Sequence, residues 1–354
     1  MKYKKTIIVL IIVILISIFF ISCDNKKTKE KTKNYKYKIG MVTEKSGLED
    51  KTFNELTYKG LLKIKEEYGI KINVRQVKDE MKYQYNLKKL AQRNDLVYGV
   101  GFYMKDAVEK VANNKQDTNF VLVDSESDLQ NIKSIVFKEE EGSFLMGIIA
   151  GKMTKVNKVG FIGGIESITT QRFKSGYIAG VNAVNINASE DLINKKNVRY
   201  VGSFNDTDKA YGLAKQLYDN GCDIIYHVSG RSGFGVFKAA KESGKFAIGV
   251  DQDQAEIIPE YKDVILSSMI KNIDKASYNV ALESLQGNFK GGIDNKLELG
   301  LKENGVGVAE STKNNVPKEI LDLVEQYQKA IINGVVLIPK TPDEVKEFKR
   351  QTLK

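Results

Sequence analysis

Two aspartates stand where apolar, strand-like runs end. Asp124 follows the run 119–123, and Asp251 follows the run 246–250. Open α/β sheets bind their ligands beyond the carboxyl ends of the strands. A carboxylate there accepts hydrogen bonds from ligand hydroxyl or ring N–H groups, and it suits the vicinal hydroxyls of a ribose. Both aspartates are therefore candidate ligand-binding residues, and the alternative is that each caps the N-terminus of a helix.

The sequence holds few groups suited to catalysis. His227 is the sole histidine, and its place inside an apolar run favours a core or hinge position over a general base. One histidine and two cysteines do not supply the ligands of a zinc site. Neither a Gly-x-Ser-x-Gly elbow nor a Gly-Lys-Thr/Ser phosphate loop occurs. The sequence thus predicts a protein without catalysis, metal or cofactor.

Amide, aromatic and glycine residues add further candidates for binding. Asn54 offers a donor and an acceptor together, which suits the edge of a base, or it is a surface residue in the first turn of a helix. Phe204 and Phe234 lie in predicted loops, where a base stacked on a ring contributes about 1–3 kcal/mol, or they are ordinary packing residues. The glycine-rich segment 230–235 either receives a polar ligand edge or makes a tight turn.

The elements that position these residues follow a repeated plan. The segments 38–42, 95–100 and 119–124 resemble 158–162, 223–228 and 246–251, at offsets of 120, 128 and 127 residues. Three matches in the same order indicate two lobes of one βαβ plan, in which Asp124 and Asp251 are equivalent. The alternative is that strands of βαβ units simply look alike.

The predicted organisation has two lobes and several crossings between them. One lobe comprises 38–138 plus about 268–310, and the other comprises 139–267 plus about 311–354. The first crossing is expected at 138–142. The glycine-rich segment 287–308 is expected to be hairpin-like, and Pro317 suits the first turn of a long final helix.

The N-terminus predicts export and anchoring. Residues 1–22 combine lysines with an uninterrupted apolar run, which is typical of a signal peptide, with a single anchor helix as the alternative. Ile21-Ser22-Cys23 resembles the lipobox of bacterial lipoproteins, in which the cysteine is acylated; the alternative for Cys23 is a free or disulfide-bonded thiol. Residues 23–37 then form a lysine-rich, flexible tether.

The net charge of +10 belongs mainly to this N-terminal region. Residues 1–39 hold ten lysines and two acids, which leaves about +2 for the rest of the chain. Because the globular part is not basic and carries no nucleic-acid motif, we expect no nucleic-acid partner.

Several motifs resemble one family. Asp50-Lys51-Thr52-Phe53-Asn54 is similar to the Asp-Lys-Ser-Phe-Asn signature of the basic membrane protein (BMP) lipoproteins, which include the spirochaetal purine nucleoside receptors. The segments 141–147, 159–164, 202–206, 229–235, 249–254 and 267–271 also resemble family blocks. Together these blocks extend from the first strand almost to the final helix.

The resemblance implies a type I periplasmic-binding-protein fold, with two Rossmann-like lobes and a hinge, that passes a nucleoside to an ABC transporter. By motif position, Asn54 and Asp124 would contact the base, Asp251 and Lys271 the ribose or its surroundings, and Gly230 the ligand through its backbone. Asp50 and Phe53 of the signature, together with Phe204 and Phe234, complete the expected site. Thr43 departs from the pattern, because some members supply a stacking aromatic residue near this point.

The sequence therefore predicts a monomeric, membrane-anchored receptor for adenosine, guanosine or inosine, with the permease and ATPase of an ABC transporter as partners. Three alternatives remain at this stage. A receptor of the same fold could bind a sugar or another small polar solute. A nucleoside-processing enzyme would need an acid/base pair or a metal. An adhesin or signalling role would be consistent with the lipid anchor, but the globular part of the sequence carries no motif for it.

Overall fold

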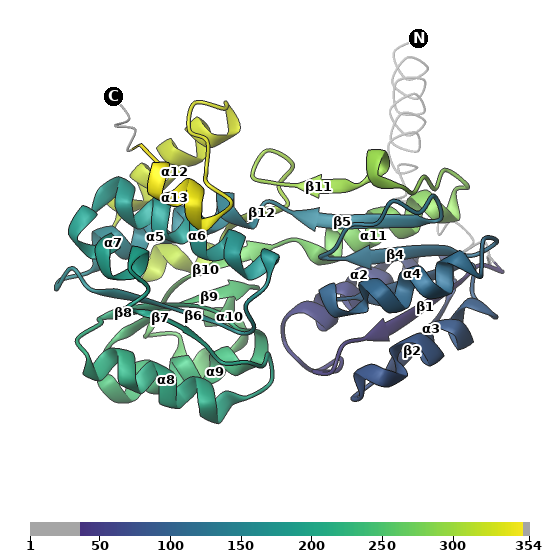
Figure 1. Cartoon of the computed structure of the whole chain (residues 1–354), viewed down its shortest axis with the longest axis horizontal. Helices are drawn as coiled ribbons and strands as arrows, with labels where there is room; N and C mark the ends of the chain where they lie inside the picture. The colour runs from purple at the N-terminus through teal and green to yellow at the C-terminus, as the bar shows by residue number, and fades with distance from the viewer. Residues whose placement is uncertain (1–35, 350–354) are drawn as a thin grey trace, which may run out of the picture.

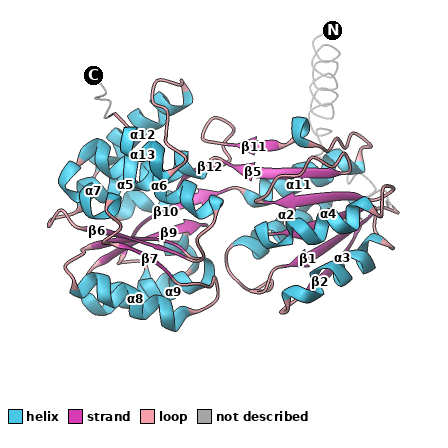
Figure 2. Ribbon diagram, in the orientation of Figure 1, coloured by secondary structure: helices cyan, strands magenta, loops and turns pink. Residues whose placement is uncertain are grey.

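Each half of the molecule is built on a six-stranded sheet. The computed structural model describes residues 36–349, so the predicted signal peptide, Cys23 and most of the tether lie outside the described residues. Figures 1 and 2 show two lobes side by side, each with helices packed over both faces of its sheet. This arrangement confirms the predicted α/β, two-lobe class.

The first lobe follows a doubly wound βαβ plan. Its sheet has the order β11-β5-β4-β3-β1-β2 with every pairing parallel. Strands covered on both faces must be apolar along their length, and residues 120–123 are all buried. The strands are β1 (Lys38–Thr43), β2 (Lys71–Gln76), β3 (Leu96–Val100), β4 (Asn119–Val123), β5 (Ile132–Phe137) and β11 (Leu297–Leu299). The helices are α2 (Phe53–Tyr68), α3 (Tyr83–Ala91), α4 (Lys105–Asn113) and α11 (Ile273–Leu285).

The second lobe repeats this plan. Its order, β12-β10-β9-β8-β6-β7, places each strand as in the first sheet, except that β12 runs antiparallel to β10. The three pairs of similar sequence runs become β1 and β6, β3 and β8, and β4 and β9. The strands are β6 (Val159–Gly163), β7 (Val198–Tyr200), β8 (Ile224–Val228), β9 (Phe246–Asp251), β10 (Ile265–Lys271) and β12 (Val306–Val308). The helices are α5 (Glu139–Met153), α6 (Ile168–Val184), α7 (Ile186–Ile193), α8 (Thr207–Asp219), α9 (Gly233–Ser243), α10 (Gln254–Ile257), α12 (Lys318–Ile332) and α13 (Pro342–Glu347).

The expected hairpin at 287–308 does not form. Its two short strands join different sheets, because β11 pairs with β5 and β12 pairs with β10. The chain thus crosses between the lobes three times, after β5, after β10 and between β11 and β12. The segment expected to return to the first lobe, about 268–310, includes the end of β10 and all of β12. Both of these strands pair in the second sheet.

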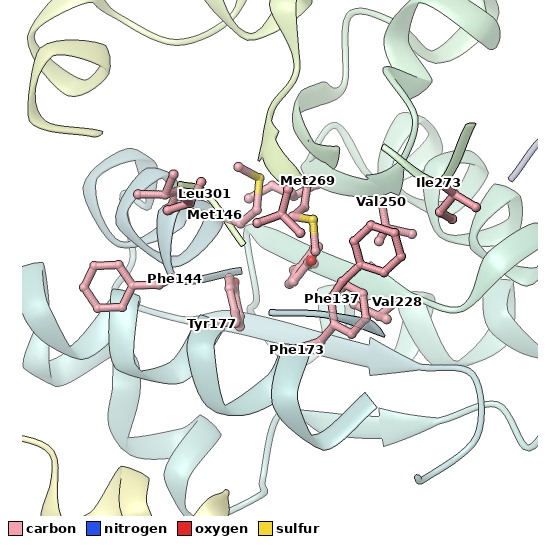
Figure 3. Packing of buried hydrophobic residues seen from close by; sticks show 14 of the residues in the cluster. Phe137, Phe144, Met146, Phe173, Tyr177, Val228, Val250, Met269, Ile273 and Leu301 are labelled. Atoms are coloured by element: carbon pink, nitrogen blue, oxygen red, sulfur yellow. The ribbon is translucent and has the colours of Figure 1, made fainter. Parts of the chain in front are cut away.

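Helices α5 and α6 form the centre of the second lobe and reach the junction of the lobes. Added side chains at Gly147 and Gly180 would clash with the backbone of the facing helix, so glycine permits this close crossing. Figure 3 shows Phe137 of β5 grouped with Phe173 of α6 and Val228 of β8. Apolar packing is therefore continuous across the junction. Within residues 36–349, no helix is both long and apolar enough to cross a bilayer.

Candidate functional site

A cavity lies between the lobes at the carboxyl ends of both sets of strands. Its empty space, together with the open solvent at its mouth, is about 670 Å³. Its lining combines four carboxylates, one ammonium group and five aromatic rings from both lobes. The lining residues are Glu44, Ser46, Asp50, Thr52, Phe53, Gly101, Phe102, Tyr103, Asp124, Thr169, Thr170, Phe173, Phe204, Val228, Gly230, Val250, Asp251 and Lys271.

The two strand-end aspartates face this shared cavity. Asp124 directly follows β4 and Asp251 ends β9, and both adopt the left-handed conformation, with φ of 65° and 70°. This rare conformation at equivalent positions turns each chain sharply where the strand ends. Neither residue is a helix N-cap, because β5 is the next element after Asp124 and Asp253 precedes α10.

Lys271 ties the aspartate of the first lobe to the second lobe. Its Nζ lies 2.7 Å from both carboxylate oxygens of Asp124 and 3.0 Å from Oε1 of Glu139. The other oxygen of Glu139 accepts from Arg172 Nε at 2.7 Å. Burial lowers the pKa of Lys271, but the Asp124 and Glu139 carboxylates outweigh this effect and leave the pKa raised. Lys271 is therefore a cation held in place by two buried anions.

Aromatic rings surround the Lys271 ammonium group. Its Nζ lies 5.2 Å from the ring centre of Phe53, 4.8 Å from that of Phe137 and 5.6 Å from that of Phe173. The negative ring faces favour the cation where water is excluded. Phe53 and Phe173 thus serve both the cavity wall and the position of Lys271.

Asp251 has a different charge balance. Burial raises the pKa of its carboxyl to about 7, because the stabilising field of Lys271 does not offset burial and the nearby Asp124 carboxylate. Burial also raises the pKa of Asp124, although Lys271 opposes the shift. Asp124 and Asp251 thus place several hydrogen-bond acceptors close together in the cavity. Ligand hydroxyl groups that donate to them would offset the repulsion between these acceptors.

The signature segment, 50–54, leads into α2 and supplies its first two residues. Asp50 accepts from the backbone N–H groups of Thr52, Asn54 and Glu55 at 3.1, 2.9 and 3.1 Å. These bonds satisfy N–H groups that the helix itself leaves free. Asp50 therefore orders the loop between β1 and α2 while one side of it faces the cavity.

The sequence-predicted residues separate into two groups. Asp50, Phe53, Asp124, Phe204, Gly230, Asp251 and Lys271 all line the cavity. Asn54 and Phe234 do not. Asn54 is fully buried among the side chains of the β1–α2 loop. Phe234 lies in the first turn of α9 rather than in a loop, and it packs on the core that α8 and α9 share. Thr43 is likewise buried behind the lining.

Gly230 and His227 show how the second lobe supports the cavity. Gly230 has φ of 54°, and a side chain there would lie 3.3 Å from the Phe204 carbonyl oxygen. His227 is fully buried, with Nε2 3.0 Å from Gln254 Oε1, and burial lowers its pKa to about 4. It is a neutral core residue away from the lining, as its apolar surroundings in the sequence indicated.

Sequence reasoning identified Phe204 but missed the two aromatic residues that lie beside it, Phe102 and Tyr103. Phe102 and Tyr103 have ring centres 4.0 Å apart, and each meets Phe204 edge to face at 6.4 and 6.5 Å. Glu44, Thr169 and Phe173 were also missed. Glu44 and Tyr103 follow strand ends, which was a usable signal. Phe173 lies inside a helical apolar stripe and gave none.

Two similar lobes around a polar and aromatic cavity are typical of a solute-binding protein. Among residues 36–349, no cluster of His, Cys, Asp and Glu could hold a metal. The chain belongs to the family described as ABC transporter substrate-binding protein PnrA-like, which matches residues 37–341. This match confirms the predicted resemblance, and the family consists of solute-binding proteins rather than enzymes.

Known proteins similar to this chain agree with that assignment. An ABC transporter nucleoside-binding protein, BmpA, of Lactococcus lactis is 34% identical, covering 85% of this chain and 89% of its own. Basic membrane protein A of Borreliella burgdorferi is 30% identical, covering 97% and 98%. A CD4+ T-cell-stimulating antigen of Listeria innocua is 36% identical, covering 91% and 93%. A solute-binding protein of an ABC transporter system from Aeropyrum pernix shares the fold, with a TM-score of 0.75 at 24% identity over 88% and 96%.

Proposed function

We propose that this protein captures a purine nucleoside in the cavity between its lobes and delivers it to an ABC transporter. The observation that carries the proposal is the pairing, in one cavity, of two strand-end carboxylates with aromatic rings from both lobes. A relative with 34% identity is named a nucleoside-binding protein.

The polar groups suit the ribose. Its hydroxyls donate to Asp251 and to Asp124, whose motif position had implied a base contact but which is paired with Lys271 near Asp251. Carboxylates crowded in a buried site favour a ligand that brings donors and no negative charge.

The rings suit the base. A purine stacks on Phe204 or Phe102, and each stacking contact contributes about 1–3 kcal/mol. A free sugar would use the carboxylates yet leave most of this aromatic surface without a partner. We therefore favour a nucleoside over the alternative of a sugar.

Isothermal titration calorimetry with adenosine, guanosine, inosine, cytidine and ribose tests the proposal. We expect purine nucleosides to bind, cytidine to bind more weakly and ribose not to compete. Asp251→Asn should weaken binding, whereas Asp263→Asn outside the cavity lining should not. Binding of ribose alone would establish the sugar receptor, and the absence of heat and of thermal stabilisation with every nucleoside would refute the proposal.

The anchoring and delivery steps are also part of the proposal. Acylation of Cys23 would hold the protein at the outer face of the cell membrane, with residues 24–37 as tether. Cys23→Ser should abolish palmitate labelling and release the protein from membranes, and retention of the unlabelled variant would contradict the anchor. We further expect a monomer in light scattering, and loss of nucleoside uptake on deletion of the cognate permease.

A further inference from the structure

Glu44 is a cavity carboxylate to which no role has yet been assigned. It lies directly after β1, is half-buried and lines the cavity. Its Oε1 accepts from Asn54 Nδ2 and from the Ser46 backbone N–H, both at 3.2 Å. Oε2 takes part in neither bond. The Ser46 side chain also hydrogen-bonds the Glu44 carboxyl, so Glu44 is held in a loop fixed to the start of α2.

Asn54 is committed to holding that loop. Its Oδ1 accepts from the Glu44 backbone N–H at 3.1 Å, and its Nδ2 donates to Glu44 Oε1 and, at 3.0 Å, to Asp50 Oδ2. Both the oxygen and the amino group of the Asn54 amide are therefore occupied by these hydrogen bonds. Pairing of Asn54 with a base would break these buried bonds, so the base edge needs another partner.

Glu44 lies at the aromatic end of the cavity. A side chain added at Gly101, directly before Phe102, would lie 3.7 Å from Glu44 Cβ. The Glu44 charge helps to raise the pKa of Tyr83 and of Tyr103, and the Asp50 charge helps to raise the pKa of Glu44. The pKa of Asp251 is instead shifted by the charges of Lys271, Asp124, Asp50 and Glu139. The cavity therefore has two polar ends: an ion-paired end suited to a ribose, and Glu44 beside the rings on which a base would stack.

We propose that Glu44 reads the base edge and makes the site selective for 6-oxopurine nucleosides, guanosine and inosine, over adenosine. This inference rests on the proposed function. An ionised carboxylate only accepts hydrogen bonds. Hypoxanthine and guanine present an N1–H donor, and guanine adds an amino group, whereas N1 of adenine is itself an acceptor. With Glu44 opposite N1, adenosine would set the N1 lone pair against the carboxylate, which discriminates by repulsion as well as by a lost bond.

The charge state sets the assay condition. Burial raises the pKa of Glu44, although bonds from Ser46 and Asn54 oppose the rise. Measurements at pH 8 therefore favour the ionised carboxylate over measurements at neutral pH. A protonated Glu44 would donate as well as accept and would blur the selectivity.

The test titrates the full-length protein and its Glu44→Gln variant with guanosine, inosine and adenosine. Glutamine can keep the Oε1 bonds and place an amino donor where Oε2 stands. We expect wild type to bind guanosine and inosine roughly tenfold or more tighter than adenosine. Glu44→Gln should lose at least about tenfold in guanosine affinity and keep or improve adenosine affinity. Glu49→Gln, an exposed carboxylate of the same loop, is the matched control and should change neither.

A ligand series on wild type keeps the test independent of the variant's folding. 1-Methylguanosine and 1-methylinosine lack the N1 donor and should bind roughly tenfold or more weakly than their parents. Equal wild-type affinity for adenosine and guanosine would overturn the inference while leaving nucleoside binding intact. So would an equal loss for all ligands in a folded Glu44→Gln variant, which would indicate a structural role. Failure of wild type to bind any nucleoside would instead overturn the proposed function and this inference with it.

Discussion

The ammonium group of Lys271, at the end of β10, lies 2.7 Å from both carboxylate oxygens of Asp124, directly after β4. This pair joins the two sheets at the floor of the cavity. Both side chains are largely buried, with 1% of Lys271 and 10% of Asp124 exposed. The pair therefore links the stability of the lobe junction to the binding site.

Lys271→Met should destabilise the protein by about 3–5 kcal/mol, because it leaves Asp124 and Glu139 buried without their cation. Urea unfolding checks this value. Lys318→Met removes an exposed partner of Asp322 on α12 and should cost less than about 1 kcal/mol. Equal effects of the two substitutions would show that the buried pair contributes no more than a surface pair.

Asp251 should give stability a distinct pH dependence. Its pKa is about 7 in the folded state against an ordinary value of 3.8, so between these values the folded protein holds a proton that the unfolded chain releases. The stability from this group is therefore present at low pH and is lost as pH rises toward and through 7. The free energy of unfolding of wild type, measured relative to that of the Asp251→Asn variant, should fall by up to roughly 4 kcal/mol as the pH rises from 4 to 8. Parallel profiles for the two proteins would contradict this assignment.

Gly164→Ala should weaken nucleoside binding through Phe204. An added methyl group would clash with the Phe204 ring, which must then move within the aromatic group. Loss of one stacking contact would weaken nucleoside binding by about 1–3 kcal/mol in calorimetry. Gly212→Ala in α8 meets no atom within 4 Å and should raise stability by up to about 1 kcal/mol without changing affinity. Unchanged affinity in a folded Gly164→Ala variant would exclude this route to the site.

Cys222 should be chemically inert in the folded protein. It is fully buried, and burial raises the pKa of its thiol to about 12. In a Cys23→Ser background, iodoacetamide at pH 8 should leave the native protein unmodified and react fully in guanidinium chloride, as mass spectrometry would show. Complete modification of native protein would mean that the second lobe opens readily.

The sequence was sufficient for most of the strands and for the duplicated plan. Buried parallel strands must be apolar along their length, so 119–123 and 246–250 could be recognised as strands from the sequence. An aspartate directly follows each of them. The hairpin prediction for 287–308 was wrong because strand propensity does not specify a partner. β11 and β12 lie close in sequence but complete different sheets.

The candidate site was only partly legible in the sequence. Residue type showed that Asn54 can pair with a base, but its orientation depends on Glu44 and Asp50, which occupy its amide. Phe204 and Phe234 looked alike as loop aromatics. The structure places Phe204 on the cavity, and it places Phe234 in the first turn of α9, on the core that α8 and α9 share.

The sequence by itself determined the periodic pattern, the strand-end carboxylates and the shortage of catalytic groups, because these depend on residue type and local order. Tertiary structure decided which residues share the cavity. It brought Lys271 to Asp124 across 147 positions and gathered Phe102, Tyr103 and Phe204 into one group. Such contacts depend on how two separately built sheets meet, and hydrogen bonds and ring packing act over a few ångströms in space rather than along the chain.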